Sequence, residues 1–546
     1  MSVFPFKPDE IIGTLTAEYQ ARKELQQQIF DLLQANQLTP SAENYYNLGV
    51  YLAQHQQWEG AIALFLHAVS LNPTGVDAYY NLGAVLQALQ QYKSAIAFYY
   101  KGLSIEVDSQ YYYHLAGCLL QLAQVEENDQ YIPVAIAYLL QRLRLQPDCQ
   151  STYYTLGSIL EQQGNAYTAS QCDKFQLPTE LIHRFYQLNP QRWQLLLPAQ
   201  SHPDVRYCKL HEAAVLPLKP PKTLEAQIHP ELNRHKDFYS SPTLVAEVQE
   251  GAVWCHSQAD VVLTRDRQIV TMVSHANATI LDIDRYLPPV SQTVETVALL
   301  SVLSGQAFYH WMFELLPKVG LIHLAGIDLN SIDKFIVNEY QAPFHKETLN
   351  HLGISSERII TSSQPIHIQA NLIVVPYFEL LSNWSCQFLR QELLSQSTFK
   401  THKPELLYIS RKNANYRHLL NEAEISDSLS QLGFTVVTLE SYSFMEQVAF
   451  VANAKVIVSL HGAGLSHLVF CQPNTKIIEI FPPNYVTRYY WNLSNLVGLD
   501  YYYFMGEPNS DINLETIENI NYHYITESFQ VSLLKLLATL KFAEAI

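Results

Sequence analysis

The chain has 546 residues, a length that predicts roughly three or four domains. Its 48% hydrophobic and 16% charged residues are typical of a globular protein with a large core. The formal charge of -17 argues against a nucleic-acid partner, because phosphate backbones are bound by concentrated cationic surfaces.

Cysteine content and the N-terminal sequence bear on the compartment. The seven cysteines are scattered, without CxxC or Cys/His ligand spacing, and are expected to be reduced. The first residues, MSVFPFKPDE, lack the basic and apolar regions of a signal peptide. Because no apolar run is long enough to span a bilayer, we expect a cytoplasmic protein.

The first third of the chain is repetitive. Gly49, Gly83 and Gly117 follow one another at intervals of 34 residues, and a fourth glycine follows 40 residues later. A tyrosine lies four residues before each of these glycines. The pattern resembles the tetratricopeptide repeat, whose paired antiparallel helices stack into a solenoid. We therefore expect residues 1–200 to form an α-helical solenoid that binds an acceptor, a protein partner or a sister subunit, with a plain spacer as the alternative.

The rest of the chain has mixed character. Residues 201–224 contain several prolines and no helical periodicity, which predicts a linker. Residues 225–398 combine short β-like runs with one strongly helical run, GQAFYHWMFELLPK. In residues 399–546 strands and helices alternate regularly, which predicts a parallel sheet covered by helices on both faces.

Polar residues end several of the strands predicted in residues 399–546. They are Arg411 after LLYIS, Glu440 after TVVTL, His461 after KVIVSL, and Glu479 within KIIEI. Parallel sheets bind ligands beyond the carboxyl ends of their strands, so these residues are candidates for one binding site.

Four motifs occur together in this part of the chain. They are GQAFYHWMFELLPK (305–318), LYISRK (407–412), VSLHGAGLSHLVFC (458–471) and IIEIFPP (477–483). As a set, and in this order, they resemble glycosyltransferase family 61 over about residues 205–520. The resemblance implies a GT-B arrangement of two Rossmann-like halves facing across a cleft, the first on the acceptor side and the second on the nucleotide-sugar side. It also implies an inverting transfer of a sugar to a hydroxyl of a glycan or protein, and the combination with repeats suggests a bacterial protein.

The HGAG turn is the candidate site for the donor diphosphate. Gly462, Ala463 and Gly464 would bring backbone N–H groups close to the phosphates at a helix start, and His461 could donate to a phosphate oxygen. Arg411 could bind phosphate with two parallel hydrogen bonds. Such groups offset the charge without a metal, so no cofactor is expected. The alternatives are a tight turn whose glycines serve packing and a surface salt bridge for the arginine.

Two carboxylates are candidates for the nucleoside. Glu479 could accept hydrogen bonds from both ribose hydroxyls, as acids in dinucleotide-binding folds do. Its alternative roles are a helix cap or an ion pair with Arg488. Glu440, one strand away, could face the base.

His310 and Glu314 are the candidate catalytic pair. Their spacing of four residues places them on one helix face, where the carboxylate could orient the imidazole that removes the acceptor proton. The alternative is that both brace the fold. Asp282 and Asp284 have the D-x-D spacing of metal-dependent transferases, but a β-turn is the better interpretation. A non-catalytic repeat scaffold with a degenerate transferase-like domain is the competing function.

Overall fold

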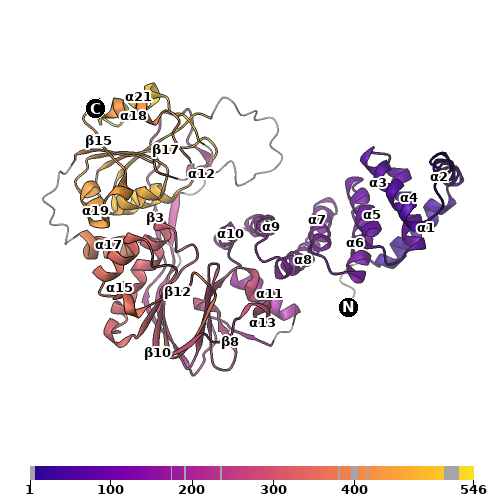
Figure 1. The fold of residues 1–546 in the computed structure, drawn as a ribbon, viewed down its shortest axis with the longest axis horizontal. Coiled ribbons are helices and arrows are strands. Elements are labelled where there is room, and N and C mark those ends of the chain that lie inside the picture. The colour runs from indigo at the N-terminus through magenta and orange to yellow at the C-terminus, as the bar shows by residue number, and fades with distance from the viewer. Residues whose placement is uncertain are drawn as a thin grey trace. The chain divides into compact units, whose positions relative to one another are not determined.

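The computed structural model describes residues 6–173, 175–189, 192–233, 236–378, 381–394, 404–414, 417–508 and 528–546. These residues divide into two compact units, which can be followed along the chain in Figure 1. Unit 1 comprises Met1–Arg192 and Ala276–Tyr286, and unit 2 comprises Trp193–His275 and Leu287–Ile546. The expected solenoid, residues 1–200, did not include the segment Ala276–Tyr286, which belongs to unit 1. The expected boundary at 398/399 lies outside the described residues.

Unit 1 is helical, as the repeat pattern predicts. Its helices are α1 (Pro8–Ala21), α2 (Lys23–Ala35), α3 (Ala42–Gln54), α4 (Trp58–Leu71), α5 (Val76–Ala88), α6 (Tyr92–Ile105), α7 (Ser109–Val125), α8 (Tyr131–Leu145), α9 (Gln150–Gln162), α10 (Ala166–Asp173) and α11 (Thr179–Leu188). Consecutive helices pack in pairs, α3 on α4, α5 on α6, α7 on α8 and α9 on α10, and each pair stacks on the next. Stacking buries apolar faces that a single pair would leave exposed.

The recurring glycines let an aromatic ring lie against the first helix of a pair. A Cβ on Gly83 would lie 2.6 Å from the ring of Tyr99, which is fully buried, and one on Gly49 would lie 2.8 Å from the ring of Phe65. Gly117 differs, because the nearest atom to its Cβ position is an amide nitrogen of Gln87 at 3.9 Å. The same repeat position is therefore sterically closed in two pairs and open in the third.

This difference predicts opposite effects of alanine at equivalent positions. Gly83→Ala should lower the free energy of unfolding by about 1–3 kcal/mol, because the buried Tyr99 ring must shift. Gly117→Ala should leave it unchanged or raise it by up to about 1 kcal/mol, because alanine favours helix and has room. Urea unfolding followed by circular dichroism measures both, and equal effects would contradict this account of the packing.

The segment Ala276–Tyr286 is held by unit 1. It forms η2 (Ala278–Asp282) and α13 (Ile283–Tyr286). The backbone N–H of Ala278 donates to the hydroxyl of Tyr153 at 2.7 Å, and Asp282 forms an ion pair with Arg144 at 3.3 Å. The β-turn expected at Asp282 and Asp284 is wrong: both lie in short helices, and Asp282 serves as an anchor for the segment.

Unit 2 begins with a large mixed sheet, which we call the N-terminal sheet. Within the described residues it has 11 strands, in the order β1-β8-β7-β6-β13-β10-β11-β12, while β5 pairs with β13 and β2, and β9 pairs with β7. Their bounds are β1 (Gln194–Leu196), β2 (Val205–His211), β5 (Thr243–Gln249), β6 (Ala252–His256), β7 (Ala259–Leu263), β8 (Gln268–Val270), β9 (His275–Ala276), β10 (Gln292–Leu299), β11 (Lys334–Val337), β12 (Ile359–Thr361) and β13 (Ile366–Tyr377). Strands β10 to β13 are parallel in the order β12-β11-β10-β13, and β5 and β6, which pair with β13 on its other side, are antiparallel to it.

Helices cover the parallel part of the N-terminal sheet. The helices and turns of this region are η1 (Thr271–Val273), α12 (Pro230–Asn233), α14 (Phe308–His310), η3 (Trp311–Leu315), α15 (Leu316–Leu324), η4 (Leu329–Ser331), α16 (Pro343–His351), η5 (Ser356–Arg358) and α17 (Asn383–Leu394). Successive residues of β10, such as Val297 and Ala298, point into separate apolar clusters on the two faces of the sheet. Because both faces are covered, these strands are continuous apolar runs.

Residues 201–224, expected to be a linker, belong to the fold of unit 2. They contain β2, which pairs with β5, and β3 (Ala214–Pro217), which pairs with β4 (Asp237–Ser240). Lys222 then pairs with the last strand of the unit, donating its N–H to Tyr501 and accepting from the N–H of Tyr503. Proline is tolerated at sheet edges, where one side of the strand needs no partner, so proline content did not indicate a linker here.

The C-terminal part of unit 2 is a second sheet, which we call the C-terminal sheet. In the described part of the chain it has five strands, all parallel, in the order β15-β14-β16-β17-β18. The strands are β14 (Leu406–Ile409), β15 (Thr435–Val437), β16 (Val456–Leu460), β17 (Lys476–Phe481) and β18 (Asp500–Met505). The helices are α18 (Glu422–Gln431), η6 (Leu439–Ser441), α19 (Phe444–Ala452), η7 (Ala463–Phe470), α20 (Tyr489–Val497) and α21 (Leu533–Phe542). The predicted alternation of strands and helices is confirmed.

Alternate residues of the C-terminal strands point to opposite faces. Ile478 and Ile480 of β17 pack with α18 and α21, whereas Ile477 and Phe481 join the cluster that contains α19, η7 and α20. Figure 1 shows α18 and α21 on the side of this sheet opposite α19. The second cluster also includes residues of α15 and α17, so one apolar core joins the two sheets of unit 2.

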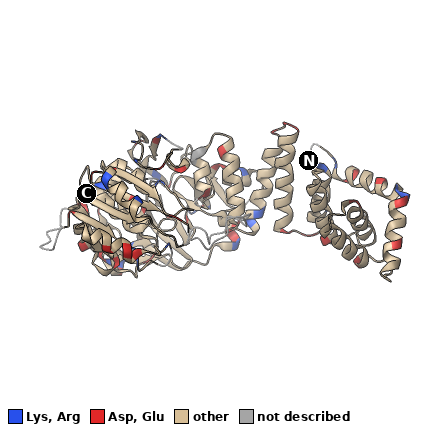
Figure 2. Ribbon diagram, turned by 90° about the horizontal axis from the view of Figure 1, so that it is seen from above, with Lys and Arg blue, Asp and Glu red and all other residues tan. Residues whose placement is uncertain are grey.

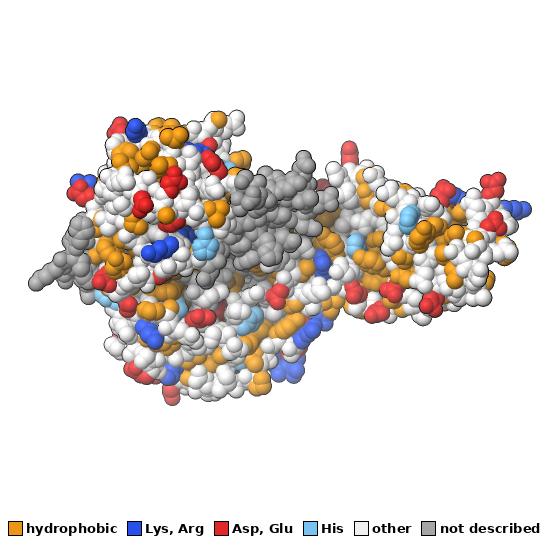
Figure 3. Space-filling view, turned by 45° about the horizontal axis from the view of Figure 1, so that its top comes forward, with side chains coloured by type: hydrophobic (Ala, Val, Ile, Leu, Met, Phe, Trp, Pro, Cys, Tyr) orange, Lys and Arg blue, Asp and Glu red, His pale blue; other side chains and the backbone are white. Residues whose placement is uncertain are grey.

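Charged residues are spread over the molecule, and the helices are those of a globular protein. Acidic and basic residues alternate in short groups along the ribbon in Figure 2, and on the face shown in Figure 3 they lie singly or in small groups. Of the helices in the described residues, none is long and apolar enough to cross a bilayer.

Candidate active site at the carboxyl edge of the C-terminal sheet

The strand order of the C-terminal sheet has a switch point between β14 and β16. The chain leaves β14 toward β15 on one side and leaves β16 toward β17 on the other, so the connections diverge between these two strands. Ligands of open parallel sheets bind at such a point. Arg411 follows β14, His461 follows β16 directly, and Glu479 lies on the adjacent β17. The sequence prediction that these three residues meet at one edge agrees with this placement.

Glu479 holds the ring of His461 in place. The Nδ1–H of His461 donates to Oε1 of Glu479 at 2.5 Å, and the hydroxyl of Tyr501 donates to Oε2 at 2.5 Å. Glu479 is 0% exposed, so its carboxylate is engaged at both oxygens and closed to solvent. The expected contact with ribose hydroxyls does not fit this geometry. The carboxylate instead fixes Nδ1 as a donor and leaves Nε2 as the nitrogen that could meet a ligand.

Arg411 lies directly against the backbone of Gly462. A Cβ on Gly462 would collide with the guanidinium, touching Nη1 and Cζ of Arg411. Gly462 has an extended backbone with φ of 173°, which any residue adopts, so the requirement for glycine here is space. The first glycine of HGAG therefore serves the approach of an arginine from the neighbouring strand.

A second arginine joins this group. Arg417 is buried, and its guanidinium lies 4.6 Å from the ring centre of Tyr485. Burial lowers the pKa of His461; Glu479 opposes this shift, and the charges of Arg417 and Arg411 add to it. The site thus combines two guanidinium groups and an imidazole that favours its neutral form.

The rest of the HGAG turn is partly open to solvent. Ala463 is exposed and Gly464 is half-buried, with its Cβ position 3.3 Å from Leu439. The helix that follows, η7, is a 3-10 helix rather than the expected α-helix. Glu440 follows the edge strand β15 in η6 and is exposed, so the structure places it on the rim of the edge and outside the buried group.

His310 and Glu314 form the predicted pair. Nδ1 of His310 lies 3.0 Å from Oε1 of Glu314, and both side chains are partly exposed. The helix carrying them is not continuous, because α14 passes into a π-helical turn, η3, before α15. Pro317 explains the change: it has no N–H for the carbonyl one turn earlier, and its ring crowds that carbonyl. Single π turns are frequent at functional sites.

Aromatic rings connect this pair to the C-terminal sheet. Phe308 stacks on His467 of η7 with ring centres 4.9 Å apart. The ring of Tyr309 lies 6.1 Å from that of Tyr490, which in turn lies 5.4 Å from the ring of His461. The candidate base and the candidate phosphate site therefore belong to one continuous region of unit 2.

Two members of the site were missed from the sequence. Tyr501 lies in the apolar run LDYYYF, where nothing distinguishes it from a core residue. Arg417 follows Arg411 by six residues in a segment without periodicity. Its closeness in the sequence to a candidate phosphate-binding arginine was the one feature that could have marked it as a site residue.

Models of known protein families match two parts of the chain. Residues 308–478 match the family model "Glycosyltransferase 61", and residues 52–90 and 76–106 match models of the tetratricopeptide repeat. The glycosyltransferase match includes His310, Glu314, Arg411 and the HGAG turn.

Curated relatives match part of this chain. A beta-1,2-xylosyltransferase of Oryza sativa subsp. japonica, XAX1, is 27% identical over 170 residues, which cover 31% of this chain and 28% of the relative. Protein O-linked-mannose beta-1,4-N-acetylglucosaminyltransferase 2 of Bos taurus is 34% identical over 124 residues, 21% of each chain. A beta-1,2-xylosyltransferase of Arabidopsis thaliana is 30% identical over 131 residues, 20% of this chain and 24% of the relative. The similarity thus spans about a quarter of the relatives' length.

A solved structure aligns at low similarity. "MamA 41-end from Desulfovibrio magneticus RS-1" is 19% identical with a TM-score of 0.23, over 34% of this chain and 99% of that one. The family models thus identify tetratricopeptide repeats within residues 52–106 and a glycosyltransferase 61 domain at residues 308–478.

Proposed function

We propose that this protein is an inverting glycosyltransferase that moves a sugar from a nucleotide-sugar donor to a hydroxyl of a glycan or protein acceptor. The observation that carries the proposal is the Arg411 guanidinium packed on Gly462 beside His461, at the carboxyl edge of a parallel sheet. We further propose that the two sheets of unit 2 are the halves of a GT-B arrangement. Strand orders β12-β11-β10-β13 and β15-β14-β16-β17-β18, each parallel, support two Rossmann-like halves.

In this proposal the C-terminal sheet binds the donor. A departing nucleoside diphosphate gains negative charge, which Arg411, Arg417 and the N–H groups of the HGAG turn would stabilise. His461, with Nδ1 fixed by Glu479, would present Nε2 to a phosphate oxygen. These groups supply the positive charge that a metal ion provides in other transferases, so we propose that no cofactor is required.

The N-terminal half supplies the base. Inversion requires proton removal from the acceptor on the face opposite the leaving diphosphate. His310, with its imidazole oriented by Glu314, is the candidate for this step. The names of the relatives indicate xylose or N-acetylglucosamine as the transferred sugar, and both are donors to test first.

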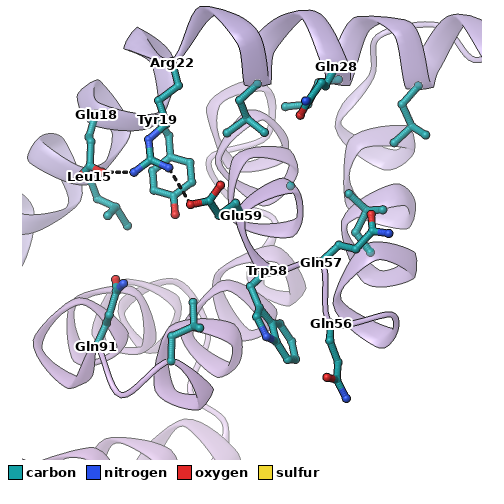
Figure 4. A pocket seen from close by; sticks show the side chains of 16 residues that line it. Leu15, Glu18, Tyr19, Arg22, Gln28, Gln56, Gln57, Trp58, Glu59 and Gln91 are labelled. Atoms are coloured by element: carbon teal, nitrogen blue, oxygen red, sulfur yellow. Dashed lines mark hydrogen bonds and ion pairs between the residues drawn. The ribbon is translucent and has the colours of Figure 1, made fainter.

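For unit 1 we propose binding of the acceptor or of a protein partner. A cavity of about 700 Å³ lies between α1, α2 and the first repeats. Figure 4 shows Trp58 at this cavity, with Gln28, Gln57 and an Arg22 that bridges Glu18 and Glu59. An indole face and carboxamides that donate and accept hydrogen bonds suit the faces and hydroxyls of sugar rings.

The competing function is a scaffold that binds partners without catalysis. Calorimetric titration with UDP and GDP sugars separates the two, because a degenerate site would bind neither. The close packing of Arg411 on Gly462 favours the enzyme, since a degenerate site has no need to keep a glycine at this contact.

The donor site is tested by Arg411→Ala. Loss of a charge-assisted hydrogen bond to phosphate should weaken nucleotide binding by about 2 kcal/mol, roughly thirtyfold in Kd. Gly462→Ala should weaken it as well, because the new methyl group displaces the guanidinium. Lys412→Ala is the matched control, since that neighbour is exposed. Equal affinity of the two site variants and the wild type for UDP and GDP would contradict the placement.

The base is tested by His310→Ala. Removing a general base should lower kcat about 10²- to 10⁴-fold while the Kd for donor and the melting temperature stay unchanged. His323→Ala, at an exposed position on the same helical run, controls for nonspecific effects. Undiminished turnover would place the base elsewhere, and a loss of both activity and melting temperature would indicate bracing.

The role of unit 1 is tested by Trp58→Ala. If the indole stacks on an acceptor sugar, binding to arrayed glycans should weaken by about 1 kcal/mol, roughly fivefold, without change in donor affinity. Tyr51→Ala is the control, because this tyrosine is exposed on α3 and does not line the cavity. Glycan binding that is indifferent to Trp58→Ala would leave the repeats as a site for protein partners or as a spacer.

A further inference from the structure

A buried hydrogen-bonded group lies directly before the candidate phosphate ligand Arg411. Ser410 follows β14 and is 3% exposed, and its hydroxyl donates to Oε1 of Glu422 at 2.6 Å. The hydroxyl of Tyr408, a fully buried residue of β14, donates to Oε2 of the same carboxylate at 2.9 Å. Glu422 is the first residue of α18, so one carboxylate joins the end of β14 to the helix that follows.

Ser410 and Arg411 point to opposite faces of the C-terminal sheet. Side chains alternate along a strand, and Tyr408 packs in the cluster that contains α18, whereas Ile409 belongs to the cluster of the other face. Ser410 contacts α18 as Tyr408 does. Arg411 lies against Gly462 at the start of η7, on the face of Ile409. The serine therefore acts on Arg411 through the backbone, from the face opposite the guanidinium.

Hydrogen bonds hold the peptide groups on both sides of Arg411. The N–H of Ser410 donates to the carbonyl of Val437 on β15 at 2.8 Å, and the N–H of Lys412 donates to the hydroxyl of Ser410 at 3.3 Å. The carbonyl of Arg411 accepts from the N–H of Ala414 at 2.9 Å. The Ser410 hydroxyl thus links the backbone beyond Arg411 to the carboxylate at the start of α18.

Helix stability alone does not account for this arrangement. A carboxylate in the first turn of a helix is favourable because of the helix dipole, and it has this effect when it faces solvent. Glu422 instead turns toward β14, where it accepts from two hydroxyls beside an apolar cluster. Apolar groups of the same shape in place of buried hydrogen-bonded partners can be nearly neutral in stability. A polar group kept at the residue before Arg411 therefore favours a role in the site.

We propose that Ser410, anchored by Glu422, is a positioning residue that fixes the backbone of Arg411 so that the guanidinium is held ready for the donor phosphates. This inference rests on the proposed function. A side chain loses freedom when it binds a ligand, and a backbone that is already fixed lowers this cost. A shift of the strand end would move the guanidinium away from Gly462, and small displacements of a positioned group are costly.

The test compares Ser410→Ala with Tyr408→Phe in the full chain. Each variant removes one hydroxyl that donates to Glu422, but only Ser410 adjoins Arg411. Ser410→Ala should weaken binding of UDP or GDP, whichever the wild type binds, about five- to tenfold, whereas Tyr408→Phe should change Kd by less than about twofold. Calorimetric titration measures Kd, at a temperature at which circular dichroism shows every variant folded.

A double-mutant cycle shows whether Ser410 acts through Arg411. If it does, Ser410→Ala should have no further effect on Kd in the Arg411→Ala background, because no guanidinium is left to position. A merely structural role would weaken binding by the same factor in both backgrounds. The cycle therefore separates positioning from a general loosening of the sheet edge.

The anchor is tested by Glu422→Ala. This variant leaves two buried hydroxyls without their acceptor, so it should lower the melting temperature and weaken nucleotide binding to about the same degree as Ser410→Ala. Asp427→Ala is the matched control, because it removes the same charge from an exposed position on α18 and should bind nucleotide as the wild type does.

Specific outcomes would overturn the inference. Ser410 would be a structural residue if Ser410→Ala bound nucleotide like the wild type, if Tyr408→Phe weakened binding equally, or if the effect were the same in both backgrounds of the cycle. Undiminished affinity in Arg411→Ala would remove that arginine from the site and overturn the inference with it. A wild-type protein that binds neither UDP nor GDP would instead overturn the proposed function.

Discussion

The fully buried carboxylate of Glu479 is the constraint around which the candidate site is built. A carboxylate removed from water must be satisfied by hydrogen bonds, and here His461 and Tyr501 each donate one at 2.5 Å. This arrangement links three adjacent strands, because His461 follows β16, Glu479 lies on β17 and Tyr501 lies on β18. It also fixes the tautomer and direction of the imidazole. Nε2 of His461 is left free of this carboxylate, and the charges of both arginines act on the same imidazole.

Space is the second constraint on the site. Arg411 occupies the volume that a side chain at position 462 would need, so glycine there lets the guanidinium keep its present position. The N-terminal half contributes through aromatic contacts, with Phe308 on His467 and Tyr309 near Tyr490. The family match at residues 308–478 begins at Phe308 and ends on β17, so it includes both Phe308 and His467 but not Tyr490.

Local patterns in the sequence predicted much of this arrangement correctly. The glycine period predicted the helical pairs of unit 1, and at Gly49 and Gly83 the missing side chain admits an aromatic ring of the partner helix. The alternation after residue 399 gave the parallel sheet, and the spacing of His310 and Glu314 gave a pair at 3.0 Å. Residues 201–224 were mistaken for a linker, because edge strands tolerate proline and its presence therefore does not exclude strand pairing. Nothing in the sequence of Ala276–Tyr286 indicates that this segment packs with unit 1.

The sequence by itself determined the helical pairs of unit 1, the alternation of strands and helices in the C-terminal sheet, the strand ends that carry polar residues, and the motifs that resemble glycosyltransferase family 61. These follow from periodicity and from residue type, which act between neighbours in the chain. Tertiary structure alone decided the roles of individual side chains. From the sequence, Glu479 was expected to bind a ribose, but β18 places Tyr501 against its carboxylate, which is closed to solvent. Arg417 comes close to His461, and Lys318 to the carbonyl of Ser301, only when segments distant in the chain pack together. Burial and charge depend on what surrounds a residue in space, and that is set by strand order and by the packing of one sheet's helices on the other's.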